Sequence, residues 1–440
     1  MSPAAAEAAT QRPGNPWWIP PILGRVPPEV DARQLSLIGA VALAIYFEGY
    51  DITMAAQAIK YIREDFGLPQ SEIGRVSAWF RLGAIPAFFL IPFGDVFGRR
   101  RVFLLCIVGS SFATLATAFT QSIEQFILVQ IFARTFLITG VAQAYVIVAE
   151  EVPAAHRGWS IGILGAFSAL GVGLGALLFS MIEWLPYGWR SLYVVGVVPL
   201  ALMPYFRARV RETARFTRER ATGARAAFAL GEWIGPIVAL STRHPVRTLC
   251  VIGIAAFSSA ATGPVHALAA DYVLTDHGWA PWEFSLMYLT GGVVGVIGNT
   301  LTGRLGDRFG RRIVGCAIFA TMPLFGLAFY NGGSAWLLIV AWPLLAFTTT
   351  GGSMIVRALA TELFPTSSRG TATGVLILVE TLGSAAALWL ITWFTPMGTS
   401  IAVAVRAVVF VSAAAAVLAL CLPETARRDL EDISGGGGSG

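Results

Sequence analysis

The sequence is poor in the residues on which soluble proteins and enzymes depend. Only 13% of its 440 residues are charged, against roughly a quarter in an ordinary soluble domain. Its four histidines and four cysteines show no spacing that suits a metal site or a disulfide framework. It also lacks a Ser/His/Asp pattern and a phosphate-binding glycine loop followed by lysine. These absences exclude a soluble domain, argue against a membrane enzyme or sensor, and predict no cofactor.

Long apolar runs are what the sequence has instead. Hydrophobic residues make up 55% of the chain and gather in runs such as 35–46, 102–119, 161–182 and 408–422. Runs that reach about 20 residues are long enough to cross a bilayer as helices. The sequence therefore predicts an all-α polytopic membrane protein of 12 transmembrane helices. We expect them near residues 35–58, 76–95, 101–120, 126–149, 158–181, 189–207, 247–270, 281–303, 312–330, 336–360, 371–394 and 402–421.

The basic residues predict how these helices are oriented. Thirty of the 31 are arginines, and most fall in loops that an even number of spans places on one side. Because basic loops stay in the cytoplasm, we expect both termini there, in the inner (plasma) membrane. The exceptions are Lys60, Arg63, Arg75 and Arg190, which fall in loops on the opposite side. The formal charge of +5 therefore indicates the orientation in the membrane rather than binding of nucleic acid. We expect a monomer whose partners are the bilayer, protons and a small solute.

An internal repeat at an offset of 212 residues divides the chain. Asp95-Val-Phe-Gly-Arg-Arg100 recurs as Asp307-Arg-Phe-Gly-Arg-Arg312. The Glu150 segment (Glu-x-x-Pro-x-x-x-Arg-Gly) recurs at Glu362, and Glu212-Thr-Ala-Arg recurs at Glu424. Three pairs without drift indicate a duplicated six-helix unit. The expected parts are an N-terminal segment (1–34), two six-helix bundles (35–207 and 247–422), a basic linker (208–246) on the membrane surface, a tail (423–434) and 435–440, which resembles an added flexible linker.

The repeated motifs resemble those of the major facilitator superfamily. Gly303-Arg-Leu-Gly-Asp-Arg-Phe-Gly-Arg-Arg312 is similar to the loop between the second and third helices of each half, and the Glu-x-x-Pro-x-x-x-Arg-Gly pattern is similar to the sugar-porter and organic-solute branch. The resemblance implies a gating or structural role, in which the aspartates cap helices or pair with arginines and latch the two halves together. Since Ile91 and Val96 depart from the pattern, we expect a weaker latch in the first half. The motif residues are Gly94, Asp95, Gly98, Arg99, Arg100, Glu150, Arg157, Gly303, Asp307, Arg308, Gly310, Arg311, Arg312, Glu362 and Arg369.

Five charges within the predicted spans do not recur at the offset of 212. Each costs roughly 2.5–3.5 kcal/mol to insert, so each is a functional candidate. At about 1.5 Å per helical residue, four of them lie at one depth, roughly 20–24 Å from the basic face, and can form a nearly neutral buried cluster. The five are Glu48, Asp51, Arg81, Arg134 and Glu380, whose counterparts are Ala260, Gly263, Val293, Ala346 and Ser168.

The first two acids resemble a known element. Glu48-Gly-Tyr-Asp51 is similar to the Asp-Gly-x-Asp element in the first helix of aromatic-acid and related organic-acid proton symporters. A buried carboxyl group can take up a proton on one side and release it on the other, while a nearby arginine attracts an anionic substrate. Glu48, Asp51 and Glu380 are therefore the candidate proton carriers. The alternatives are a static ion cluster for Asp51 and Arg134, and pairing with a neighbouring helix for Glu380.

The candidate substrate-binding residues are polar side chains in the same spans. Arg81 or Arg134 would receive a negative group, and polar or aromatic neighbours could complete the site. Core packing is the alternative for each neighbour, and for His266 a hydrogen-bonded position near the membrane interface. The neighbours are Tyr50, Gln143, Tyr145 and His266.

The sequence thus favours a secondary active transporter. The leading hypothesis is proton-coupled symport of a small organic anion, such as a carboxylate, by alternating access. Two alternatives stay open, namely proton-coupled efflux of drugs or organic cations, and uncoupled facilitation of a sugar-like solute. The fifth predicted helix lacks the Gly-Pro-x-x-Gly-Gly element often found in antiporters of the family, which lowers the weight of efflux.

Overall fold

The described part of the chain is built from helices and the loops that join them. The computed structural model describes residues 16–19, 25–221, 245–363, 369–395 and 400–424. The first half contains α2 (Ala32–Gln57), α3 (Ile59–Asp65), the 3-10 turn η2 (Gln70–Glu72), α4 (Ile73–Arg81), α5 (Ala84–Leu90), α6 (Phe93–Phe97), α7 (Arg99–Thr117), α8 (Ile123–Glu151), α9 (Arg157–Ser180), α10 (Trp189–Val194), α11 (Val197–Ala201), α12 (Met203–Arg209) and α13 (Ala214–Ala221). The second half contains α15 (Pro245–Asp271), the π-helical turn η5 (Tyr272–Asp276), α16 (Pro281–Phe309), α17 (Arg311–Tyr330), α18 (Ala335–Glu362), α19 (Arg369–Phe394), α20 (Ile401–Val409) and α21 (Ser412–Cys421).

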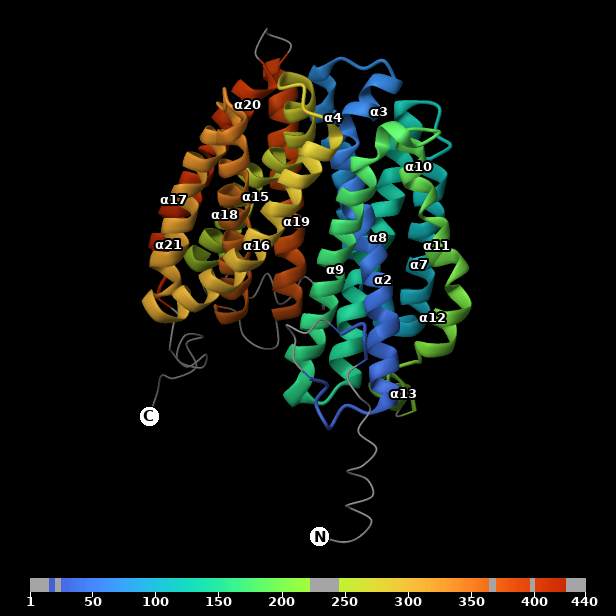
Figure 1. Cartoon of the computed structure of the whole chain (residues 1–440). Helices are drawn as coiled ribbons and strands as arrows, with labels where there is room; N and C mark the ends of the chain where they lie inside the picture. The colour runs from blue at the N-terminus through green and yellow to red at the C-terminus, as the bar shows by residue number, and fades with distance from the viewer. Residues whose placement is uncertain (1–15, 20–24, 222–244, 364–368, 396–399, 425–440) are drawn as a thin grey trace, which may run out of the picture.

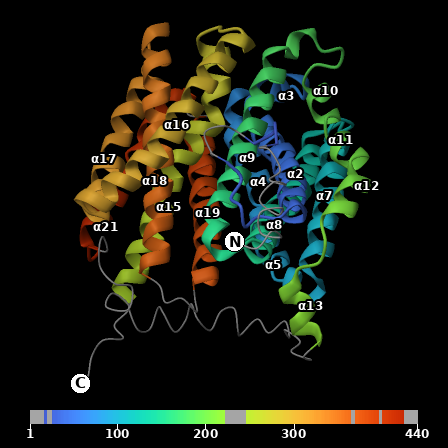
Figure 2. The ribbon, with the colours of Figure 1, turned by 60° about the horizontal axis from the view of Figure 1, so that its bottom comes forward.

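The helices form two bundles that stand side by side. α2 to α12 make one bundle and α15 to α21 the other (Figure 1). The N-terminal and C-terminal helices also stay in separate groups when the molecule is turned (Figure 2). α13 lies at one end of the molecule and α3 at the other (Figure 1). We call the end that carries residues 99–101, 207–218 and 304–312 the basic end, and the end that carries α3, η2 and η5 the far end.

Most of the predicted spans appear as single helices. Among the described residues, ten helices are long and apolar enough to cross a membrane, and an eleventh span results if the bent pair 189–201 and Met203–Arg209 is counted as one. The helix predicted near residues 76–95 is instead broken into α4, α5 and α6, which together cover 73–97. Together these spans are consistent with the twelve predicted from the sequence.

The break between α4 and α5 has a local cause. Gly83 packs so closely on α8 that a β-carbon would lie 2.6 Å from the carbonyl oxygen of Ile131. The Thr135 hydroxyl donates to the carbonyl of Gly83 at 3.0 Å, which satisfies a backbone acceptor at the break. Pro92, which has no backbone N–H, precedes α6. The hydrophobicity pattern does not reveal such breaks, because the broken segment is as apolar as an intact one.

The apolar core is continuous between the bundles only toward the far end. One buried cluster contains residues of both halves, among them Ile62 and Val76 from the first and Leu268 and Leu388 from the second. Two further clusters each contain residues of a single half, 19–210 and 250–422. The rings of Trp79 and Trp389 meet across the joint with centroids 5.4 Å apart. The far ends of the two bundles are therefore packed together.

The repeated motif forms the same turn twice. Gly98 and Gly310 have φ of 102° and 100°, a conformation that favours glycine, and each precedes a helix. Glu212 accepts from the backbone N–H of Arg100 at 3.1 Å, and Glu424 accepts from the N–H of Arg311 at 2.7 Å. A carboxylate at a helix N-terminus is favourable because the first N–H groups have no partner within the helix. The sequence revealed Glu212 and Glu424 as a repeated pair but not this capping role.

Four ion pairs of the motif join neighbouring helices within one half, as expected for an aspartate beside an arginine, while the expected latch between the halves stays a prediction. In the first half Arg99 pairs with Asp95 at 3.0 Å and with Glu150 at 2.8 Å. In the second, Arg311 pairs with Asp307 at 2.7 Å and with Glu362 at 3.2 Å. These contacts tie together three consecutive helices of one bundle.

The first copy of this network is the weaker one, as expected from its departures in sequence. Arg311 also donates to the Gly303 carbonyl at 3.1 Å, whereas Nε and Nη1 of Arg99 are buried without a hydrogen-bond partner. The carbonyl of Ile91, the residue that corresponds to Gly303, accepts from Gln143 at 2.7 Å instead. The other motif residues have contacts of their own. Gly94 and Gly303 are helical, Arg308 lies over the ring of Phe309, and Arg157 is exposed at the start of α9. Arg100 donates to the Val210 carbonyl, and the backbone N–H of Arg312 donates to Glu424.

Gly310→Ala is expected to lower the midpoint of thermal unfolding by at least ~3 °C. Its φ is unfavourable for alanine, and the added β-carbon would lie 2.3 Å from Oε2 of Glu424, which caps α17. The matched control is Gly333→Ala, which introduces no contact within 4 Å at a residue without positive φ. Equal midpoints for both variants in detergent, measured by intrinsic fluorescence, would show that the turn does not need glycine.

Parts of several predicted segments lie outside the described residues. These parts are residues 1–15 and 20–24 of the N-terminal segment, 222–244 of the basic linker, 425–434 of the tail and 435–440. The described beginning of the linker contains the helix α13. Arg369 begins α19, and its side chain also lies outside the described residues.

Candidate functional site

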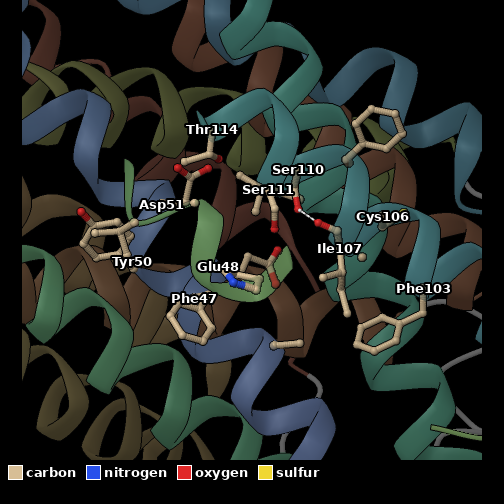
Figure 3. A pocket seen from close by; sticks show the side chains of 17 residues that line it. Phe47, Glu48, Tyr50, Asp51, Phe103, Cys106, Ile107, Ser110, Ser111 and Thr114 are labelled. Atoms are coloured by element: carbon tan, nitrogen blue, oxygen red, sulfur yellow. Dashed lines mark hydrogen bonds between the residues drawn. The ribbon is translucent and has the colours of Figure 1, made fainter. Parts of the chain in front are cut away.

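A small acidic cavity lies inside the first bundle. It has a volume of about 50 Å³ and is lined by residues of α2, α7, α8 and the α10–α11 segment. Glu48 and Asp51 enter it from α2, because residues three apart share one face of a helix. Asp51 lies beside Thr114, and Glu48 lies near Ser111 (Figure 3). The carboxylate Oδ1 of Asp51 is buried without a hydrogen-bond partner. A cavity of this size can hold water or a proton-bearing group but no organic substrate.

Arg81 and Arg134, both partly buried, do not join these acids in one ion-paired cluster. Glu48, Asp51, Arg81 and Arg134 all belong to the described residues. No carboxylate oxygen among them lies within 4.0 Å of a guanidinium nitrogen among them, the limit for an ion pair. Arg134 donates to the Ile52 carbonyl at 3.1 Å and lies over the ring of Phe80, 5.1 Å from its centroid. Arg81 points to the other bundle. Residue counts predict only the depth of these side chains, whereas the direction of each depends on the rotation of its helix.

A larger polar cavity lies where Arg81 meets the second bundle. We call it the arginine cavity; its volume is about 260 Å³, and α15, α17, α18 and α19 supply all of its wall except Arg81. Glu380 lies on the same wall as Ile377, Thr381 and Ser384, which follow one face of α19 at helical spacing. Arg81 and Glu380 therefore line one cavity from opposite bundles.

Arg81 is held at the cavity by neutral groups. Its Nη1 donates to Ser384 Oγ at 2.8 Å and its Nη2 donates to the Gly263 carbonyl at 3.2 Å. Its Nε is buried without a hydrogen-bond partner. Among the described residues, no carboxylate lies within ion-pair distance of this guanidinium group. A partly buried cation without a counterion is unfavourable, so this position is suited to receive an anion from the cavity.

Hydroxyl groups make up most of the remaining polar wall. Six of them bond back to carbonyls of their own helices, at 2.9–3.5 Å. Because the hydroxyl protons are used in this way, the oxygens present lone pairs to the cavity. The wall therefore favours a ligand that donates hydrogen bonds. The six residues are Ser258, Ser259, Thr262, Thr348, Thr349 and Ser353.

The other predicted substrate residues have contacts of their own. Tyr50 lines the acidic cavity, and its hydroxyl donates to the Leu192 carbonyl at 2.6 Å. Gln143 donates to Ile91, as described above, and Tyr145 packs at the edge of the core of the first bundle. His266 Nδ1 lies 3.0 Å from the Thr262 carbonyl, and its ring is 5.3 Å from that of Trp342. None of these four lines the arginine cavity as Arg81 and Glu380 do.

Nothing in the described residues suggests a metal centre. No group of three or more His, Cys, Asp or Glu side chains among them could hold a metal ion. The four cysteines are free, and two of them are buried in helices.

The sequence profile of the Major Facilitator Superfamily matches residues 40–269 and again residues 249–438. The chain belongs to this superfamily. The major facilitator chain is thus a multi-pass membrane transporter of small solutes rather than an enzyme, as the sequence predicted.

Relatives of this major facilitator chain include transporters named for organic acids. It is 25% identical over 385 residues to the gallate transporter of Pseudomonas putida, with 81% of this chain and 84% of that protein covered. It is 27% identical over 355 residues to the cis,cis-muconate transport protein of Acinetobacter baylyi, with 78% and 84% covered. The 3-(3-hydroxy-phenyl)propionate transporter of Escherichia coli is 21% identical over 363 residues, with 82% and 87% covered.

Solved structures support the fold. A bacterial homologue of the human lysosomal transporter Spinster, in an inward-facing and unoccupied conformation, matches with a TM-score of 0.74 at 16% identity and covers 89% of this chain and 97% of its own. The inward-open xylose transporter XylE of E. coli matches with a TM-score of 0.69 at 20% identity, with 91% and 99% covered. At these identities the likeness shows the major facilitator fold alone.

The sequence reasoning missed the partners of Arg81. Ser384 was not singled out, although it lies four residues after Glu380 and so on the same helix face. Gly263 was noted only as the counterpart of Asp51. A β-carbon there would lie 1.8 Å from Ser384 Oγ, so glycine lets α15 and α19 approach closely beside the cavity. The spacing from Glu380 was the available signal for Ser384.

Proposed function

We propose that this transporter is a proton-coupled symporter of a small organic carboxylate, which works by alternating access. The observation that carries the proposal is Arg81, a cation without a described counterion at a polar cavity between the bundles. A guanidinium group binds a carboxylate through two parallel hydrogen bonds. The names of the relatives, which refer to gallate, muconate and a hydroxyphenylpropionate, support an organic acid as the substrate.

The wall of the arginine cavity supports a narrower substrate class. Its hydroxyl oxygens act as acceptors, so the preferred acid carries hydroxyl groups that donate to them. Arg81 also disfavours an organic cation, because like charges in a poorly hydrated cavity repel. Efflux of cationic drugs is therefore the less favoured alternative, although Glu380 lines the same cavity.

The proton would be carried by the first bundle. Glu48 and Asp51 share the acidic cavity, and Arg134 on the adjacent helix donates to the carbonyl of Ile52 beside them. We place the basic end in the cytoplasm, with the protein in the inner membrane, because basic loops are retained there. An inward proton gradient would then drive uptake of the acid.

Purified protein in proteoliposomes tests the proposal. The substrates are labelled hydroxybenzoates, and benzoate serves as the comparison acid without hydroxyl groups. We expect the hydroxybenzoates to accumulate only when the outside is more acidic than the lumen. A gradient of one pH unit supplies about 1.4 kcal/mol per proton, which corresponds to about tenfold accumulation for one proton per anion. Equal levels with and without the gradient would indicate uncoupled facilitation, and accumulation of organic cations into an acidic lumen would indicate efflux.

A further inference from the structure

Four basic residues at the far end conflict with the charge rule that orients the rest of the chain. Two of them are balanced within the first bundle, since Arg190 pairs with Asp65, and Arg75 pairs with Glu72 at 2.6 Å. The other two, Lys60 and Arg63, lie on α3 and reach across to the second bundle, and Arg63 also pairs with Glu64 of its own helix at 3.4 Å.

Their partners gather at the end of α15. Arg63 Nε lies 3.4 Å from Oδ1 of Asp271, and Gln70 donates to the other carboxylate oxygen at 2.8 Å. Lys60 Nζ donates to the Leu274 carbonyl at 3.2 Å, within η5. A cation there is favourable because carbonyls at a helix C-terminus are unpaired and carry partial negative charge.

The acid in this cluster is completely enclosed. The side chain of Asp271 has 0% exposure, and that of Arg63 only 14%. Thr275 donates to Oδ1 of Asp271 at 3.3 Å, and Gln70 is also 3.3 Å from Asp276. Separating the bundles here would leave a buried carboxylate without its cation until water enters, and such a change is far more costly than breaking an exposed pair.

The cluster lies on the far side of the arginine cavity. Asp271 is eight residues beyond Gly263 on α15, or about 12 Å along the helix. Between them, Val265 and Leu268 belong to the apolar core that both bundles share. Along α15, the ionic cluster and this apolar layer therefore lie between the far end and the wall of the arginine cavity at Gly263.

We propose that Lys60, Arg63 and Gln70, together with Asp271 and the carbonyl of Leu274, form the far-end gate of this transporter. The gate holds the cavity closed to the outside in the observed state, and its bonds break when the protein opens outward. This inference rests on the alternating access of the proposed function but on neither the substrate nor the proton.

Cysteine accessibility tests the gate without substrate. In a background with Cys106, Cys250, Cys316 and Cys421 replaced by serine, Thr349→Cys reports on the cavity. Intact cells are treated with a membrane-impermeant maleimide. We expect Asp271→Asn to raise the labelling rate at Thr349→Cys at least ~5-fold, because it weakens one state of a two-state equilibrium. The double exchange Arg63→Asp with Asp271→Arg should return the rate toward the starting value.

The matched control is Asp65→Asn, which removes a far-end acid whose pair with Arg190 lies within one bundle. It should leave the rate unchanged. Gln70→Ala, which keeps the ion pair, should give an intermediate increase in the labelling rate. This variant replaces Asp271→Asn in the test if Asp271→Asn is not produced. An unchanged rate in both Asp271→Asn and Gln70→Ala, or an equal rise in Asp65→Asn, would overturn the gate.

A second reporter separates this inference from the proposed orientation. Tyr187 is 75% exposed and lies in the far-end segment between α9 and α10, shortly before Arg190 in the first turn of α10. Tyr187→Cys should be labelled rapidly in intact cells in every gate variant. If it is labelled only in inverted vesicles, the orientation is wrong, and the same gate comparison is made from that side. Labelling that reports gating while no acid is transported would contradict the proposed substrate but not the gate.

Discussion

Arg81→Gln is expected to abolish high-affinity binding of the organic acid while the protein stays folded. Removing one partner of a buried, hydrogen-bonded charge pair costs about 2–5 kcal/mol, which corresponds to at least ~30-fold weaker binding. Arg81→Lys should recover only part of the affinity, because an ammonium group lacks the planar pair of donors. The measurement is the apparent affinity for the acid in initial uptake rates, together with substrate-dependent thermal stabilisation of the purified protein.

Two variants separate the charge of Arg81 from its contacts between the bundles. Ser384→Ala removes the acceptor at 2.8 Å but keeps the guanidinium group, so binding of the acid should be largely retained. Arg134→Gln removes a partly buried arginine that contacts Ile52 and Phe80 and lies outside the arginine cavity. If Arg134→Gln weakened binding as much as Arg81→Gln, or if Arg81→Gln bound the acid normally, Arg81 would not be the anion-binding residue.

The fold was predictable because the patterns that specify it can be read along the sequence, without knowledge of which helices are neighbours. Apolar runs of sufficient length give the helices, and pairs such as Asp95 and Asp307 at one offset give the duplication. The same repeat gives equivalent turns at Gly98 and Gly310, with φ within 2° of each other. The breaks in the segment 73–97 were not predictable in this way, because they depend on how closely Gly83 approaches a neighbouring helix.

The candidate site was predictable only in part. The failure of five charges to recur singled out Arg81 and Glu380, which line one cavity, as well as Glu48 and Asp51, which line another. That they divide between two cavities depends on helix rotation, which residue counts do not determine. Lys60 and Arg63 were noticed only as exceptions to the charge rule, since their partners at the end of α15 are more than 200 residues away in sequence.

The physical separation of the two cavities has a mechanistic consequence. Arg81 bonds to the second bundle, whereas Glu48 and Asp51 are enclosed by helices of the first. Proton and substrate would therefore not compete for one group. Coupling would have to act through α2, α4 and α8, whose packing joins Asp51, Ile52, Arg134 and Phe80. Under this arrangement, proton coupling and substrate binding can be lost separately.

Glu48→Gln is expected to abolish proton-driven accumulation of the acid and to leave exchange intact. Glutamine keeps the size and hydrogen-bonding capacity of a protonated glutamate but cannot release a proton. The loaded carrier could still reorient, so counterflow of labelled against unlabelled acid should persist within about twofold. Net accumulation under a gradient of one pH unit should fall from about tenfold to about onefold in the proteoliposome assay.

Asp51→Asn and Glu380→Gln identify the proton carrier among the three acids. Asp51 shares the acidic cavity with Glu48, so its amide variant should also lose accumulation. Glu380 lines the arginine cavity, and its amide variant should change the affinity for the acid more than the accumulation ratio. If Glu48→Gln and Asp51→Asn still accumulate the acid tenfold while Glu380→Gln does not, the proton is carried beside the substrate, and the acidic cavity has a structural role.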